Sequence, residues 1–271
     1  MNLVFYGHHK AATSWLSGNF ANLMRDSGWQ GRGFNHLRFD EDDLAEIKLL
    51  QAKNRATFFL VTNSCWADRE LFPHSKGVHL IRDPRDMIVS AYHSHRESHP
   101  LFPGLAEERA QLQEASLEDG LVIVIEGIMN QILKELGKWK FGEDRDIFEV
   151  RFEDLKVDGG KVMRDFLKFA GVYRERDPLF WPRAGYNVVI KKTGLEPAGY
   201  WRVPYFSEKS LQVHLERRDY KKSQQGSKKG HHRSGALKQW EKDFTPKVKE
   251  AFKANFPNLP AHMGYEDDDS W

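Results

Sequence analysis

Four short apolar segments constrain the fold of this chain more than any other feature of its sequence. They are Leu3–Tyr6, Thr57–Val61, Val78–Ile81 and Ile147–Val150, and they are rich in Val, Ile and Phe. Each segment is apolar on both faces, which is typical of a parallel strand that helices cover on both sides. The segments therefore predict an α/β fold with a central, mainly parallel sheet.

The stretches around these segments carry helical patterns. Apolar residues recur at helical spacing within residues 16–24, 162–170 and 248–252. Gly171 follows the second pattern at a position typical of a helix end, and Thr245 precedes the third as a predicted N-cap. Strands that alternate with helices favour a sheet flanked by helices.

Length and composition agree with one globular domain. The 271 residues are 40% hydrophobic and 30% charged, and we expect a single domain over residues 1–271. With 41 Lys and Arg against 39 Asp and Glu, the net charge is +2, so we expect no nucleic-acid partner. One cysteine, Cys65, cannot form an internal disulfide and favours a reducing compartment.

The sequence shows no leader pattern at its start. Its most apolar stretch elsewhere, Leu121–Ile125, is far shorter than the ~20 residues of a membrane helix. We therefore expect a soluble cytoplasmic protein without a membrane partner.

The first candidate site is the loop after the first strand, GHHKAATS, residues 7–14. A loop between a parallel strand and a helix points backbone N–H groups at whatever lies above the sheet, and the helix dipole favours an anion there. Lys10 adds a full positive charge, and Thr13 and Ser14 add hydroxyls. The Walker A pattern is absent. Taken alone, the loop also fits an ordinary turn with a helix cap.

The second candidate site follows the strand at residues 78–81. Arg82 lies at the predicted edge of the sheet, and Asp83, Pro84 and Asp86 form a capping-box-like helix start. Ser90 lies two turns into that helix, so Arg82 and Ser90 could reach one anion. The alternative is a surface arginine before a well-capped helix.

The third candidate site is a basic, glycine-containing loop. Five basic residues within 228–233 surround Gly230 and precede Gly235, and glycines let backbone N–H groups approach an anion. Trp240 and Phe244 are predicted to be the buried residues that hold this loop. The alternative is a solvated charged face.

Together the three loops place three cations at one edge of one sheet: Lys10, Arg82 and Arg233. A ligand with two separated phosphate-type groups would need such an arrangement.

In the order and spacing of these motifs, the chain resembles the sulfotransferase family, which uses 3′-phosphoadenosine 5′-phosphosulfate (PAPS). The matching stretches are HKAATSWL at residues 9–16, RDPRDMIVS at 82–90 and RSGALKQWEKDFT at 233–245, with a further match at FEDL, residues 152–155. The resemblance implies a P-loop-like three-layer domain, with a central mainly parallel sheet flanked by helices. It also implies transfer of a sulfuryl group to a hydroxyl or amine acceptor, with adenosine 3′,5′-bisphosphate (PAP) as product and no metal.

The resemblance assigns roles to the matching positions. Lys10 should stabilise the leaving oxygen, Trp15 should lie against adenine, and Arg82 and Ser90 should hold the 3′ phosphate. Thr13 and Ser14 should bind the 5′ phosphate, and residues 233–235 should close over the 3′ phosphate. The cofactor-binding residues so predicted are Lys10, Ala11, Ala12, Thr13, Ser14, Trp15, Arg82, Ser90, Arg233, Ser234 and Gly235.

Several positions depart from the family pattern. His9 replaces a proline, Lys238 replaces a glycine, and Phe152 replaces a tyrosine, which keeps a stacking ring without its hydroxyl. Ala12 replaces a loop glycine. An alanine there still allows close approach of an anion, provided that its φ is negative.

The general base is the least family-like feature. Asn63 stands where cytosolic members carry a histidine, and an amide cannot accept a proton at neutral pH. His36 lies near the position from which other members supply a carboxylate and can titrate near neutrality, so we predict Lys10 and His36 as catalytic. His8, His9 and Asp68 are the alternatives.

Two other functions remain open from the sequence: a P-loop-type kinase or NTPase, and a catalytically inactive member of the fold. The aromatic segment 178–206 is a possible acceptor lid for a small molecule or a saccharide, and 219–235 is a possible mobile cofactor loop. Residues 266–269 are predicted to be a solvated tail.

Overall fold

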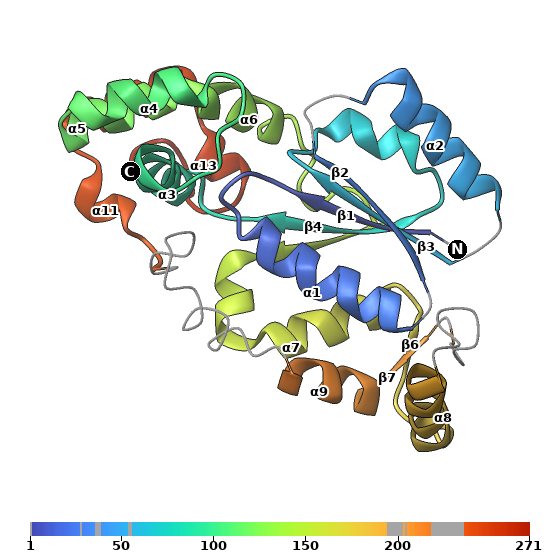
Figure 1. Cartoon of the computed structure of the whole chain (residues 1–271). Coiled ribbons are helices and arrows are strands. Elements are labelled where there is room, and N and C mark those ends of the chain that lie inside the picture. Colours follow the sequence, from blue (N-terminus) through green and yellow to red (C-terminus); the bar gives the residue numbers. More distant parts are fainter. Residues whose placement is uncertain are drawn as a thin grey trace.

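A parallel sheet forms the centre of the molecule (Figure 1). The computed structural model describes residues 2–27, 29–35, 39–53, 56–193, 203, 205–217 and 236–271. The sheet has five strands in the order β2-β3-β1-β4-β5, and every pairing is parallel. The strands are β1 (Asn2–Gly7), β2 (Gln30–Asn35), β3 (Thr57–Thr62), β4 (Lys76–Ile81) and β5 (Ile147–Arg151). The predicted fold class is confirmed.

Helices cover both faces of the sheet because its strands are apolar on both sides. In β1, Val4 and Tyr6 pack on one face and Leu3 and Phe5 on the other. The first face packs against α2 (Glu41–Ala52), α3 (Pro84–Glu97), α5 (Leu117–Glu126), α6 (Ile128–Leu136) and α12 (Pro246–Asn255). The second face packs against α1 (Thr13–Asp26), α7 (Phe152–Phe169) and α9 (Glu208–Arg217). The molecule therefore has three layers.

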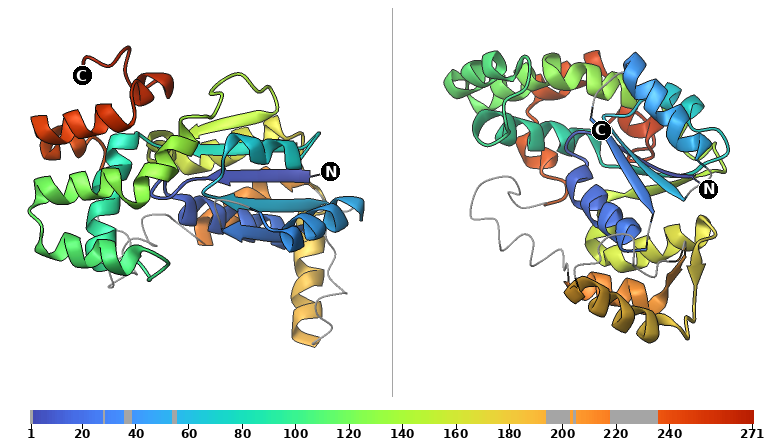
Figure 2. Two further views of the ribbon diagram at one scale, coloured as in Figure 1. Left: turned by 90° about the horizontal axis from the view of Figure 1, so that it is seen from above. Right: turned by 45° about the vertical axis from the view of Figure 1, so that its right-hand side comes forward.

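The remaining elements connect or extend these layers. Figure 2 shows that α8 extends away from the sheet layers, and a two-stranded sheet joins β6 to β7. These elements are η1 (Trp66–Leu71), α4 (Leu105–Glu114), β6 (Tyr173–Arg174), α8 (Phe180–Thr193), β7 (Phe206–Ser207), α11 (Trp240–Asp243) and α13 (Leu259–His262). Within the described ranges, no helix is both long and apolar enough to cross a membrane.

The predicted helix ends are confirmed where the sequence carried a capping signal. Gly171 follows α7 with a φ of 71°, a conformation that costs glycine little. Thr245 is the N-cap of α12, and its hydroxyl accepts the N–H of Val248 at 3.4 Å.

The predicted solvated tail at residues 266–269 is wrong at its first residue. Glu266 forms an ion pair with Arg85 at 2.6 Å, and the backbone of Asp269 accepts the ammonium of Lys253 at 2.7 Å. Trp271 packs against Trp240 in the first-face core. Glu266 is therefore not a solvated charge, because its partner Arg85 is buried, whereas Asp267 and Asp268 are exposed.

Candidate active site at the carboxyl edge of the sheet

The loop between β1 and α1 is tightly folded on itself. The hydroxyl of Thr13 donates to the carbonyl of His8 at 2.5 Å, and the N–H of Ala11 donates to the same carbonyl at 3.2 Å. Gly7 is required at the end of β1, since a Cβ there would lie 2.5 Å from Thr13 Cγ2. The loop therefore holds Lys10 at the carboxyl edge of the central strand.

Two residues of this loop adopt left-handed backbone. Lys10 has a φ of 68° and Ala12 a φ of 63°. The condition of a negative φ at Ala12 is therefore not met, and the residue occupies the conformation for which glycine is better suited. Ala12 is the N-cap of α1, and its side chain cannot accept a hydrogen bond from the first-turn N–H groups.

Arg82 joins three separate segments at the same edge. Its guanidinium donates to the carbonyl of Lys10 at 3.0 Å and to the carbonyl of Ala236 at 3.3 Å. It also lies 4.6 Å above the ring of Phe152, in the predicted FEDL segment. Arg82 is 6% exposed. The three predicted motifs therefore converge on one buried cation.

The start of α3 is capped as predicted by Asp83, but Asp86 has a different role. The Asp83 carboxylate accepts the N–H of Arg85 at 2.9 Å. Asp86 does not complete a capping box: its carboxylate accepts the N–H of Lys238 at 2.8 Å and that of Trp240 at 3.2 Å. The second motif thereby fixes the backbone of the third.

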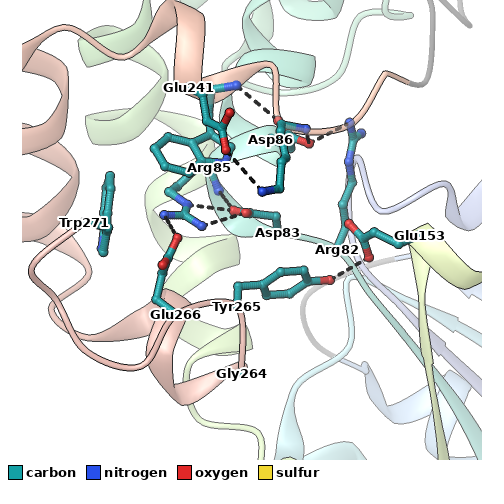
Figure 3. Close-up of polar contacts among 12 residues, drawn as sticks. Arg82, Asp83, Arg85, Asp86, Glu153, Glu241, Gly264, Tyr265, Glu266 and Trp271 are labelled. Atoms are coloured by element: carbon teal, nitrogen blue, oxygen red, sulfur yellow. Dashed lines mark hydrogen bonds and ion pairs between the residues drawn. The ribbon is translucent and has the colours of Figure 1, made fainter.

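Four residues contact Arg85, and Figure 3 labels three of them: Asp83, Glu266 and Trp271. Its guanidinium pairs with Asp83 and Glu266, and it lies 3.6 Å above the ring of Trp240 and 4.5 Å from that of Trp271. Trp240 and Phe244 are buried, as the sequence predicted. Residues 264–271 thus pack behind the helix start that carries Arg82.

Lys10 and Arg82 place two positive charges close together. Burial, together with the charge of Arg82, lowers the pKa of Lys10 from 10.5 to about 8. Two adjacent cations are unfavourable unless an anion lies between or beside them. The electrostatics therefore favour an anionic ligand at this edge.

Some predicted site residues lie outside the part of the chain that the structure describes: His36, Arg233, Ser234, Gly235 and the whole segment 219–235. The other predicted residues lie in the β1–α1 loop, in the first turn of α1, between β4 and α3, and in α3 itself. In that group, Ser14 is exposed, Trp15 is half-buried, and Ser90 is part-exposed on α3.

Two of the alternative bases, His8 and Asp68, are buried. His8 is 1% exposed, and its Nε2 lies 2.7 Å from Nε2 of His79. Burial lowers the pKa of His79 to about 3. Asp68 is also buried, and its carboxylate accepts the backbone N–H and the thiol of Cys65. Asn63 has a φ of 56° just after β3.

His9 belongs to a chain of hydrogen bonds that sequence reasoning missed. Its Nε2 lies 2.8 Å from Nε2 of His95, and Nδ1 of His95 lies 2.6 Å from Glu108. The sequence offered a histidine just past the second motif, yet no periodicity links residues 86 positions apart. Among the described residues, no group of three or more His, Cys, Asp or Glu could hold a metal ion.

The comparisons with known proteins agree with this architecture. A family model described as sulfotransferase domain matches residues 68–264. The mouse sulfotransferase SULT7A1, whose crystal structure is complexed with PAP, is 17% identical with a TM-score of 0.50, over 96% of this chain and 83% of that one. The comparison with curated proteins finds no match.

Two further solved structures are more distant. Retinol dehydratase, in complex with androsterone and inactive cofactor PAP, is 15% identical with a TM-score of 0.44, over 95% of this chain and 80% of that chain. A sulfotransferase from Alicyclobacillus acidocaldarius is 14% identical with a TM-score of 0.41, over 97% and 93% of the two chains.

The family match covers more than half of the chain, from η1 to the end of α13. The chain therefore belongs to the sulfotransferase family, and its function is that of a sulfotransferase. The match includes Arg82 and the FEDL segment but begins after the β1–α1 loop.

Proposed function

We propose that this sulfotransferase takes its sulfuryl group from PAPS and releases PAP. The observation that carries the proposal is the contact of buried Arg82 with the backbone of Lys10 and of Ala236, which gathers the three motifs at one edge. The PAP complex of the mouse relative supports the same ligand.

Lys10 is proposed to neutralise the charge that develops on the bridging oxygen as the sulfur–oxygen bond breaks. Thr13, Ser14 and the backbone of Ala11 and Ala12 would bind the 5′ phosphate at the start of α1, where the helix dipole favours an anion. Trp15 would lie against the adenine.

The 3′ phosphate is proposed to lie beside Arg82 and Ser90. Arg82 follows β4 at the edge of the sheet, just before α3 begins at Pro84, and Ser90 lies about two turns along that helix. Arg233, Ser234 and Gly235 would close over this phosphate from the third motif.

The reaction we propose is an in-line transfer to a hydroxyl or amine of a small-molecule or saccharide acceptor. Sulfuryl transfer, like phosphoryl transfer, depends on positioning and on neutralising charge at the leaving group. Lys10 and Arg82 supply fixed cations for that purpose, so we propose no metal. A single domain over residues 1–271, a cytoplasmic location and the role of 178–206 as an acceptor lid stay predictions, as does His36 as the base.

Calorimetric titration with PAP in the absence of metal tests the proposal, with ADP and AMP as controls. We expect binding that requires the 3′ phosphate and weakens at least tenfold in Arg82→Ala, because a buried charge-assisted contact is lost. Arg25→Ala, at an exposed position of α1, is the matched control and should bind PAP as the wild type does.

Two results would contradict the proposal. Absence of PAP binding would remove PAPS as the donor. Mg²⁺-dependent binding of ADP, with no preference for PAP, would favour the kinase or NTPase hypothesis instead.

A further inference from the structure

A carboxylate and two histidines form a continuous hydrogen-bonded chain that ends beside Lys10. The carboxylate of Glu108 in α4 lies 2.6 Å from Nδ1 of His95 in α3. Nε2 of His95 lies 2.8 Å from Nε2 of His9 in the β1–α1 loop. The β1–α1 loop is therefore joined to two consecutive helices that lie far from it in sequence.

The Glu108 carboxylate, at one end of the hydrogen-bonded chain, fixes the proton positions on both histidines. An ionised carboxylate only accepts hydrogen bonds, so Nδ1 of His95 carries a proton and donates to Glu108. Neutral His95 then has a bare Nε2, which accepts the Nε2 proton of His9. In neutral His9 the remaining nitrogen, Nδ1, is therefore unprotonated and able to accept a proton.

Glu108 and His95, at the buried end of the hydrogen-bonded chain, are held in place. Glu108 is 6% exposed and His95 is fully buried. The second oxygen of Glu108 accepts the N–H of Ile128 at 2.9 Å, and a Cβ at Gly127 would lie 2.5 Å from it. Arg109 donates to the carbonyl of His95 at 2.7 Å. The carboxylate is thus held by the start of α6 and cannot turn away from His95.

The open end of the hydrogen-bonded chain is His9, which the charge of Lys10 influences. His9 is half-buried, and its Nδ1 makes no hydrogen bond to the described residues and keeps some accessible surface. His9 directly precedes Lys10, the residue proposed to meet the leaving group. The other candidates have no such access, since His8 and Asp68 are buried and engaged.

We infer that His9 is the general base of sulfuryl transfer, and that His95 and Glu108 are positioning residues that set its tautomer. The inference rests on the proposed use of PAPS. The acceptor oxygen forms a bond to sulfur while the bond from sulfur to the 5′-phosphate oxygen breaks, and that oxygen keeps the electron pair. The acceptor proton moves to Nδ1 of His9, and Glu108 stabilises the resulting charge through His95.

The electrostatic surroundings keep His9 unprotonated before the reaction. Burial, and after it the charge of Lys10 and the nearby rings of His95 and His99, hold the pKa of His9 well below 6.5. His9 is therefore neutral at neutral pH.

The tautomer is measurable without any acceptor, by ¹⁵N NMR of histidine-labelled protein, with His9→Asn to assign the signal. We expect a protonated Nε2 and a bare Nδ1 in the wild type. In Glu108→Gln an amide can donate to His95, so the tautomers of His95 and His9 should both reverse. Glu107→Gln, at an exposed position of the same helix, should leave them unchanged. A protonated Nδ1 in wild-type His9 would overturn the inference.

Turnover of PAPS with 2-naphthol as the probe acceptor tests catalysis. His9→Asn should lose roughly 10²–10⁴-fold in kcat, and Glu108→Gln about 10²-fold, while both still bind PAP. His74→Asn, at an exposed turn, should keep the wild-type rate. If His9→Asn keeps that rate and His36→Asn loses it, His36 is the base and the inference fails. Loss of PAP binding in the wild type would instead contradict the proposed function.

Discussion

At the scale of single residues, Ala12 stores backbone strain in the loop that precedes α1. Its φ of 63° is costly for any residue with a Cβ. We predict that Ala12→Gly raises the free energy of unfolding by about 0.5–1 kcal/mol, after the extra entropy of glycine in the unfolded chain is deducted. Denaturant unfolding measures this difference.

Ala11→Gly is the matched control for that prediction. Ala11 is fully buried and is not among the residues with positive φ, so the same substitution there should lower the free energy of unfolding by about 1 kcal/mol. Equal effects at the two positions would show that the conformation of Ala12 carries no cost.

Lys10 is predicted to set the alkaline limit of activity. Its pKa of about 8 in the free enzyme predicts that kcat/KM falls as pH rises through 8, because the ammonium loses its proton. Lys10→Arg should move this limit upward, since a guanidinium stays charged. An unchanged limit in that variant would assign it to another group.

The acid limit reports His9 if His9 is the base. Lys10, His95 and His99 face His9, and Glu108 lies behind His95, and the net effect is a pKa well below 6.5. The rate should therefore stay constant from neutral pH to below 6.5 and fall only at lower pH, as His9 gains a proton. A half-maximal rate at or above pH 6.5 would contradict this.

At the scale of secondary-structure elements, Asp86 connects α3 to the third motif. Its carboxylate accepts two backbone N–H groups, those of Lys238 and Trp240. We predict that Asp86→Ala weakens PAP binding at least tenfold and lowers stability by about 2–4 kcal/mol, because two N–H groups lose their acceptor. Calorimetry and denaturant unfolding measure the two effects, and Asp267→Ala, at an exposed position, is the control.

Local sequence patterns predict most strands and two helix caps, but they do not predict the contacts between distant elements. The four apolar strands and the helix caps at Asp83 and Thr245 follow from local patterns, and the structure confirms them. The strand β2, QGRGFN, was missed because its glycines and polar residues suit a sheet edge and give no apolar run. The contact of His9 with His95 and the role of Asp86 depend on packing between distant elements, which no local pattern encodes.

At the scale of the whole molecule, residues 264–271 support the second motif from behind. Arg85 contacts the rings of Trp240 and Trp271. It also pairs with Glu266, as Figure 3 shows. We predict that Trp271→Ala lowers the free energy of unfolding by about 2 kcal/mol, through lost packing and a lost cation–π contact. Urea unfolding measures this change.

Trp181 provides the control for Trp271. It is 66% exposed in α8, so Trp181→Ala should change stability by no more than about 0.5 kcal/mol. Equal losses in the two variants would mean that packing against Arg85 contributes nothing.

The strand order also governs how the chain can reach its native state. β1 comes first in sequence yet lies between β3 and β4, and Asn2 pairs with Thr57. During synthesis one edge of β1 therefore stays unpaired until β3 emerges, and the other until β4 emerges. Such non-local pairing slows folding, so the apolar strand β1 stays exposed to aggregation for longer.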